Sequence, residues 1–141
     1  MKLENQVCTL EQAKKLKELG IVQDSLFMWW ETAIWDSERG VYFSSTLHRS
    51  TDTINNRTMV QSFSAFTVAE LGMMLGGIFT IERNEKLGLY FASTPKGKKK
   101  ALNFTIASAL TSELIGEIEE RSISIQEINS RLSPTIQESE P

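Results

Sequence analysis

Apolar positions in this chain follow two periods, one typical of helices and one typical of strands. A first stripe at helical spacing predicts a helix after residue 9, formed by Leu10, Ala13, Leu16 and Leu19. Thr9 and Gln12 have the spacing of a capping box, which predicts the start of this helix. Gly20 predicts its end. Residues 1–7 carry no such pattern, and we expect a frayed start.

Aromatic and β-branched residues dominate the next stretch, SLFMWWETAIW (residues 25–35), which predicts a strand. Residues 36–40 have turn composition, and 41–46 predict the returning strand of a hairpin. Large apolar groups occur on both faces of the first strand, so we expect helices or a partner to cover both sides. Residues 47–62 are polar and rich in turn formers, which predicts a long loop.

A complete helix signal follows this loop. Thr67 and Glu70 form a second capping-box pattern, and Phe66 with Leu71 has the spacing of a hydrophobic staple. The pair Gly76–Gly77 predicts the helix end. We expect the rest of the chain to be organised around this helix.

The remaining pattern predicts a second hairpin and two more helices. Residues 78–83 and 88–93 form the hairpin, 98–120 the longest helix and 124–133 a short final helix. Residues 134–141 predict a flexible tail. The sequence therefore predicts a single α+β domain over residues 1–133, with an antiparallel sheet of about four strands from two hairpins and three to four packed helices.

Composition narrows the setting of this domain. The net charge of −3 gives no general attraction to nucleic acids or anionic membranes. One cysteine, Cys8, cannot form an internal disulfide, and the first residues have no apolar signal segment. No apolar run approaches the ~18 residues of a membrane span. We expect a cytoplasmic protein that does not enter a membrane.

Three segments give the chain a resemblance to known sequences: CTLEQAKKLKELGI, SLFMWW and SAFTVAELGMML. The first half of the chain resembles a family of small uncharacterised proteins encoded by bacterial phages and conjugative elements. The likeness ends near Gly76, where Gly76–Gly77 replaces the proline of the family pattern. The resemblance implies a bacterial cytoplasm and a mobile-element origin, and it supplies no activity and no catalytic residues.

Two features could indicate nucleic-acid binding. TVAELGMMLG resembles the first helix of a helix-turn-helix, but a strand pattern follows where the recognition helix belongs. The second feature is a cluster of Lys96, Lys98, Lys99 and Lys100. These lysines, with Arg49 and Arg57, form the alternative hypothesis of a nucleic-acid-binding protein, while a solvated loop is their structural interpretation.

The aromatic strand supports the main functional hypothesis. Tryptophan is enriched at binding hot spots, and neighbouring residues of a strand point to opposite faces. We therefore expect a partner protein or a second copy to be bound by Trp29, Trp30, Trp35, His48 and Arg49. Burial of both faces under helices is the alternative interpretation.

Catalytic chemistry has little support in the sequence. His48 and Cys8 are single and far apart along the chain, and together they cannot form a structural zinc site. The carboxylates of Glu113, Glu117, Glu119 and Glu120 are expected on a solvated helix surface. We predict no catalytic residues, metal, cofactor or small-molecule substrate. The sequence favours a non-catalytic protein-binding module, a mobile-element factor that modulates a host protein.

Overall fold

The fold of this chain is given by a computed structural model that describes residues 2–52, 59–95 and 102–132. In chain order, its elements are the 3₁₀ helix η1 (Leu3–Asn5), α1 (Leu10–Leu19), β1 (Phe27–Asp36), β2 (Gly40–Arg49), β3 (Met59–Ser64), α2 (Val68–Met74), β4 (Thr80–Asn84), β5 (Leu89–Ser93), α3 (Ile106–Glu119) and α4 (Ile125–Leu132). This α+β composition confirms the predicted fold class. The tail 134–141 lies outside the described residues.

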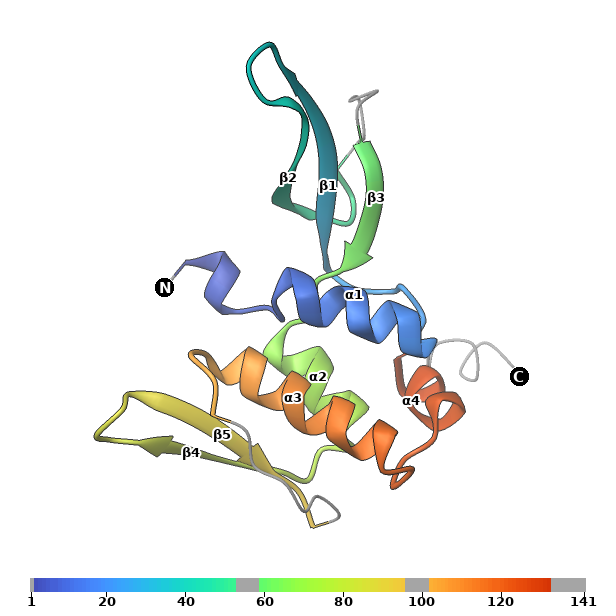
Figure 1. Ribbon diagram of the computed structural model, residues 1–141. Coiled ribbons are helices and arrows are strands. Elements are labelled where there is room, and N and C mark those ends of the chain that lie inside the picture. Colours follow the sequence, from blue (N-terminus) through green and yellow to red (C-terminus); the bar gives the residue numbers. More distant parts are fainter. Residues whose placement is uncertain (1, 53–58, 96–101, 133–141) are drawn as a thin grey trace.

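The described strands form two antiparallel sheets, whereas one sheet was expected. One has the order β2-β1-β3 and the other is the β4–β5 hairpin. Figure 1 shows the helices between them, with the three-stranded sheet rising from one side and the β4–β5 hairpin on the other. The difference arises because α2 follows β3 directly and carries the chain across the helical layer before β4 begins.

The hydrophobic core lies within the helical layer and at its contact with β3. Its fully buried side chains come from α1, α2, α3, α4 and the segment directly before α2. They include Leu16, Phe66, Leu71, Met74, Leu110, Leu114 and Ile128. Burying a side chain of this size stabilises the fold by roughly 1.5–3 kcal/mol. Phe66, Leu71 and Met74 of the α2 segment are among these side chains.

Glu70 of α2 joins the helical layer to the three-stranded sheet. One carboxylate oxygen accepts a hydrogen bond from the backbone N–H of Thr67 at 2.9 Å, completing the predicted capping box. The other oxygen accepts from the backbone N–H of Leu26 at 3.1 Å, directly before β1. The capping residue therefore also fixes the base of the sheet.

Three local predictions are wrong, and backbone pairing explains each. Val7 is buried and forms a bridge with Thr67, so residues 1–7 do not simply fray. The segment predicted as a loop contains the end of β2 and residues 59–62 of β3, because Met59–Ser64 pairs with β1. Residues 102–105, predicted as part of the longest helix, precede α3, since Asn103 exchanges two backbone hydrogen bonds with Tyr90.

Candidate protein-interaction surface

The β1–β2 hairpin is the largest structure that extends beyond the helical layer (Figure 1). The Asp36 carboxylate accepts hydrogen bonds from the backbone N–H groups of Glu38 and Arg39, at 2.8 and 3.4 Å. Gly40 has a φ of 77°, which glycine adopts without the steric cost of a side chain. These residues close a tight turn and fix a regular ladder from Phe27–Arg49 to Asp36–Gly40.

One face of this hairpin is covered by α1 near its base. The Trp29 indole N–H donates to the carbonyl of Cys8 at 3.0 Å, and the ring packs against the core. The Lys14 ammonium forms an ion pair with Glu31 at 2.7 Å. Both contacts hold α1 against the lower half of the sheet.

The cover ends beyond Glu31. Among the described residues, the β3 pairing ends at Thr32, and from there β1 pairs with β2 alone. On the face that carries Trp29 and Glu31, the next residues are apolar and stand as two cross-strand pairs: Ala33 opposite Phe43 and Trp35 opposite Val41. We call these four residues the tip face.

The tip face is apolar and open to solvent. Trp35 is 74% exposed, Phe43 61% and Val41 59%. Single exposed apolar residues are common on protein surfaces, but a contiguous group on one face marks an interaction site. The tip face is therefore the strongest candidate for contact with another protein within the described part of the chain.

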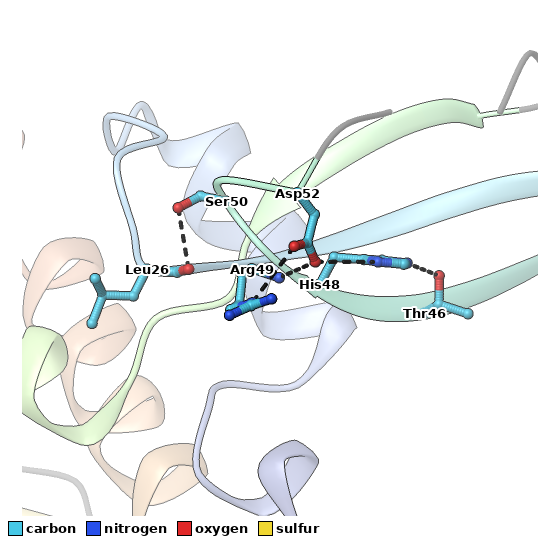
Figure 2. Close-up of polar contacts among 6 residues, drawn as sticks. All are labelled: Leu26, Thr46, His48, Arg49, Ser50 and Asp52. Atoms are coloured by element: carbon cyan, nitrogen blue, oxygen red, sulfur yellow. Dashed lines mark hydrogen bonds and ion pairs between the residues drawn. The ribbon is translucent and has the colours of Figure 1, made fainter. Parts of the chain in front are cut away.

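The opposite face is built around Trp30. Its indole ring stacks on the His48 imidazole, with ring centroids 3.6 Å apart and planes 17° from parallel. The His48 Nε2 lies 2.8 Å from the Thr46 hydroxyl, and its Nδ1 lies 3.8 Å from the Asp52 carboxylate. Figure 2 shows the side chains of Thr46, His48 and Asp52 in a row at the end of β2. The stack leaves Trp30 only 8% exposed.

Thr46, His48 and Asp52 place a hydroxyl, an imidazole and a carboxylate in the order of a catalytic triad. The geometry does not match that role. The distance from imidazole to carboxylate exceeds a hydrogen bond, and the same Asp52 oxygen accepts from the backbone N–H of Arg49 at 3.0 Å. The arrangement is better explained as one that holds the imidazole over Trp30.

The predicted partner-binding residues thus occupy three environments. Trp29 is anchored in the core, Trp30 and His48 stack on one face, and Trp35 is exposed on the other. Arg49 lies at the end of β2 with its side chain 73% exposed. The structure does not gather the three tryptophans on a single surface. Trp30 points to the face opposite Trp29 and Trp35, and only Trp29 lies at the covered base of the hairpin.

Cys8 and His48 are in different surroundings. Cys8 is fully buried, and its Sγ lies 3.8 Å from the carbonyl of Ser64. Burial raises the pKa of the Cys8 thiol to about 12, which opposes formation of the reactive thiolate. This environment gives no support to a cysteine nucleophile.

Sequence reasoning missed a buried pair of acids on α3. Glu113 is 6% exposed and Glu117 3%, so the expectation of solvated carboxylates is wrong for both, whereas Glu119 and Glu120 are exposed. The Thr94 hydroxyl lies 3.4 Å from Glu113 and 2.9 Å from Glu117. Helical spacing could have revealed the pair, because each acid lies three residues after a core leucine.

Glu117 of this pair borders a cavity of about 290 Å³ that Thr94 and Arg131 also line. Burial, the nearby Glu117 charge and a hydrogen bond with Glu117 raise the pKa of Glu113 to about 7. The Arg131 guanidinium donates to the carbonyl of Met74 at 2.9 Å and lies 3.5 Å from Glu127. Its contacts are explained by the docking of α4 on α2.

Several sequence predictions concern residues outside this description. Lys96, Lys98, Lys99, Lys100 and Arg57 all fall outside the described ranges. The nucleic-acid hypothesis for the lysine cluster therefore stays a prediction. The segment after Gly77 is described, and it forms β4 in place of a recognition helix.

Comparisons with family models, with curated proteins and with solved structures give no match to this chain. Among the described helices, none has the length and apolarity needed to cross a bilayer. Within the same residues, no group of three or more histidines, cysteines and acids is arranged to hold a metal ion.

Proposed function

We propose that this chain is a small non-catalytic protein-binding module and that it binds its partner through the tip face. The observation that carries the proposal is the solvent exposure of three large apolar side chains, Trp35, Val41 and Phe43, on one face of a projecting hairpin. Covering them removes apolar surface from water, which is favourable by roughly 25 cal/mol per Å².

The shape of the surface supports a protein partner. The tip face is exposed at the end of a projecting hairpin, whereas small-molecule sites are concave and enclose their ligand. Tryptophan is the residue most typical of interface hot spots. The backbone of Trp35 is held by a regular strand pair, so no backbone ordering is needed when its ring is covered.

The biological setting is a separate part of the proposal. The first half of the chain resembles small proteins of phages and conjugative elements. We infer a mobile-element factor whose partner is a host protein. This setting predicts that the partner is found in a bacterial lysate.

The test is affinity capture from a bacterial lysate with the full chain and matched variants. Trp35→Thr removes the central side chain of the tip face and keeps strand propensity. Phe104→Ser is the control, because Phe104 is 86% exposed but lies next to α3, away from the hairpin. Circular dichroism and thermal unfolding show whether each variant keeps its fold.

The proposal expects at least one protein whose recovery falls about tenfold with Trp35→Thr and is unchanged with Phe104→Ser. A tenfold loss corresponds to about 1.4 kcal/mol, which is typical of a hot-spot side chain. If folded Trp35→Thr recovers the same proteins as the parent chain, the tip face is not the binding site.

A further inference from the structure

The outer edge of β2 has unpaired backbone N–H and C=O groups. A hydrogen bond at the base of the hairpin shows which residues of β2 carry them. The N–H of Ser50 donates to the carbonyl of Leu26 at 2.9 Å, so the even-numbered residues of β2 face β1. The N–H and C=O groups of the odd-numbered residues point outward. Within the described part of the chain, no hydrogen bond joins the outward groups of Val41, Phe43, Ser45 and Leu47 to another element.

The other edge of the same sheet is protected. In β3 the outward N–H of Ser64 donates to the Gln23 side chain at 2.8 Å. The outward carbonyl of Ser62 accepts from the Lys17 ammonium at 3.2 Å. The edge formed by β3 is therefore occupied by side chains, whereas the edge formed by β2 is available for pairing with another strand.

The open edge has a defined end. At Arg49 the backbone N–H donates to the Asp52 carboxylate, and the Arg49 carbonyl accepts from the Asp52 backbone N–H, each at 3.0 Å. Figure 2 shows the Asp52 carboxylate folded back beside Arg49. A second strand can therefore pair with β2 only from Val41 to Leu47, a length of roughly 20 Å.

This segment lacks the features by which proteins block edge pairing. From Val41 to Leu47 it contains no proline and no charged residue, and its pairing with β1 has no bulge. Natural edge strands are usually protected by such features. The segment is thus suited to accept another strand.

We propose that two copies of this chain pair through the open edge of β2, antiparallel, about a two-fold axis at Ser44. This proposal goes beyond the proposed function, because backbone groups carry it and the tip face is not required. Antiparallel pairing of two identical strands is symmetric by construction. Centring the axis at Ser44 uses all four outward residues of each copy. Centring it one residue later would place Val41 opposite Arg49, whose backbone is already bonded to Asp52.

The side chains fit this register. Phe43 lies opposite Ser45 of the second copy, so a large group faces a small one, and Val41 lies opposite Leu47 of the second copy. No like charges meet within the paired segment, because Val41 to Leu47 contains no charged residue. The two tip faces lie on the same side of the combined sheet, where both can bind one partner.

Sedimentation of the full chain at concentrations up to about 1 mM tests the dimer. Ser44→Lys places two ammonium groups against each other at the axis, and we expect dimerisation to weaken at least tenfold. Ser37→Lys adds the same charge in the exposed turn and is the control. An equimolar mixture of Ser44→Lys and Ser44→Glu chains is expected to form a mixed dimer.

Disulfide cross-linking tests the register. Residues facing each other across such an axis have Cα atoms about 4.5 Å apart, within the range of a disulfide. Ser44→Cys is expected to form a covalent dimer under mild oxidation. Val41→Cys is the control, because its two copies would lie roughly 20 Å apart. The native Cys8 is buried and is not accessible for a disulfide with either introduced cysteine.

Two results overturn the proposal. One is a parent chain that stays monomeric over the whole concentration range. This result overturns the proposal even if a strand from another protein binds the same edge, because the proposal requires a second copy. The other is a dimer that Ser44→Lys does not weaken or that cross-links through Val41→Cys. Neither result decides the outcome of the capture experiment with Trp35→Thr, because Trp35 lies on β1 and has no part in the edge.

Discussion

The His48 imidazole covers the Trp30 indole at a centroid distance of 3.6 Å, and this contact joins β2 to β1 across the face opposite the tip face. The register places Trp30 opposite Thr46, two residues before His48, so the two rings meet diagonally. Thr46 and Asp52 flank the imidazole at its two nitrogens. The histidine therefore has a structural role in the three-stranded sheet.

Replacing His48 by alanine is expected to lower the free energy of unfolding by about 1 kcal/mol, because the aromatic pair is lost and Trp30 becomes exposed. Arg49→Ala is the matched control, since this neighbouring side chain is 73% exposed and its ion pair with Asp52 is a surface contact. Urea denaturation measures both values. Equal losses in the two variants would contradict the role of the ring stack.

Glu113 is expected to make stability depend on pH. Its folded pKa of about 7 lies above the ordinary value of 4.5, so the folded state binds the proton more tightly than the unfolded state. The contribution of this group is therefore full below about pH 4.5 and is lost as the pH rises through about 7. Glu113→Gln should remove this dependence and raise stability at pH 8 by on the order of 2 kcal/mol. Glu119→Gln should change neither the pH dependence nor the stability at pH 8, because Glu119 is exposed on the same helix. Denaturation curves from pH 5 to 8 that are parallel for parent and Glu113→Gln would disprove it.

The Cys8 thiol is expected to be unreactive in the folded chain. It is fully buried and its pKa is raised to about 12, so neither access nor thiolate formation favours attack on a disulfide reagent. Ellman's reagent at pH 8 should modify it only after unfolding in urea. A Ser37→Cys chain provides the internal comparison, with one fast thiol in the turn and one slow thiol at Cys8. Rapid reaction of both would show that the N-terminal segment opens readily.

Two helical glycines are expected to respond differently to alanine. Gly116 lies within α3, and a Cβ added there meets nothing within 4 Å, so Gly116→Ala should stabilise the fold by about 1 kcal/mol. In α2, a Cβ on Gly72 would come within 2.9 Å of the Phe79 ring. Gly72→Ala should therefore gain less than Gly116→Ala or lose stability. Thermal unfolding of both variants compares them, and an equal gain would mean that the ring shifts without cost.

Local signals in the sequence were sufficient for the starts of α1 and α2 and for the turns. Thr9, Thr67 and Gly20 act where the sequence places them, because a cap involves only a few consecutive residues. The positive φ angles of Gly76 and Gly77 likewise follow from their own lack of a side chain. The same holds for the second hairpin, whose turn is closed by the side chain of Asn84.

Features that depend on distant partners could not be predicted in this way. Residues 59–64 are a strand because β1 offers them an edge, although residues 59–62 belonged to the segment predicted as a loop. The burial of Glu113 depends on β5, which packs against α3, and on Thr94 directly after it.

The amino-acid order by itself determined the α+β class, the helix boundaries set by caps and the presence of a strand crowded with aromatic residues. Only the tertiary structure decided which of those aromatic residues meet water. Trp29, Trp30 and Trp35 are chemically alike and share one strand, yet the first anchors in the core, the second lies under His48 and the third is exposed. The physical reason is that exposure depends on where α1 and β3 end along the hairpin, and that limit is set by packing between elements far apart in the chain.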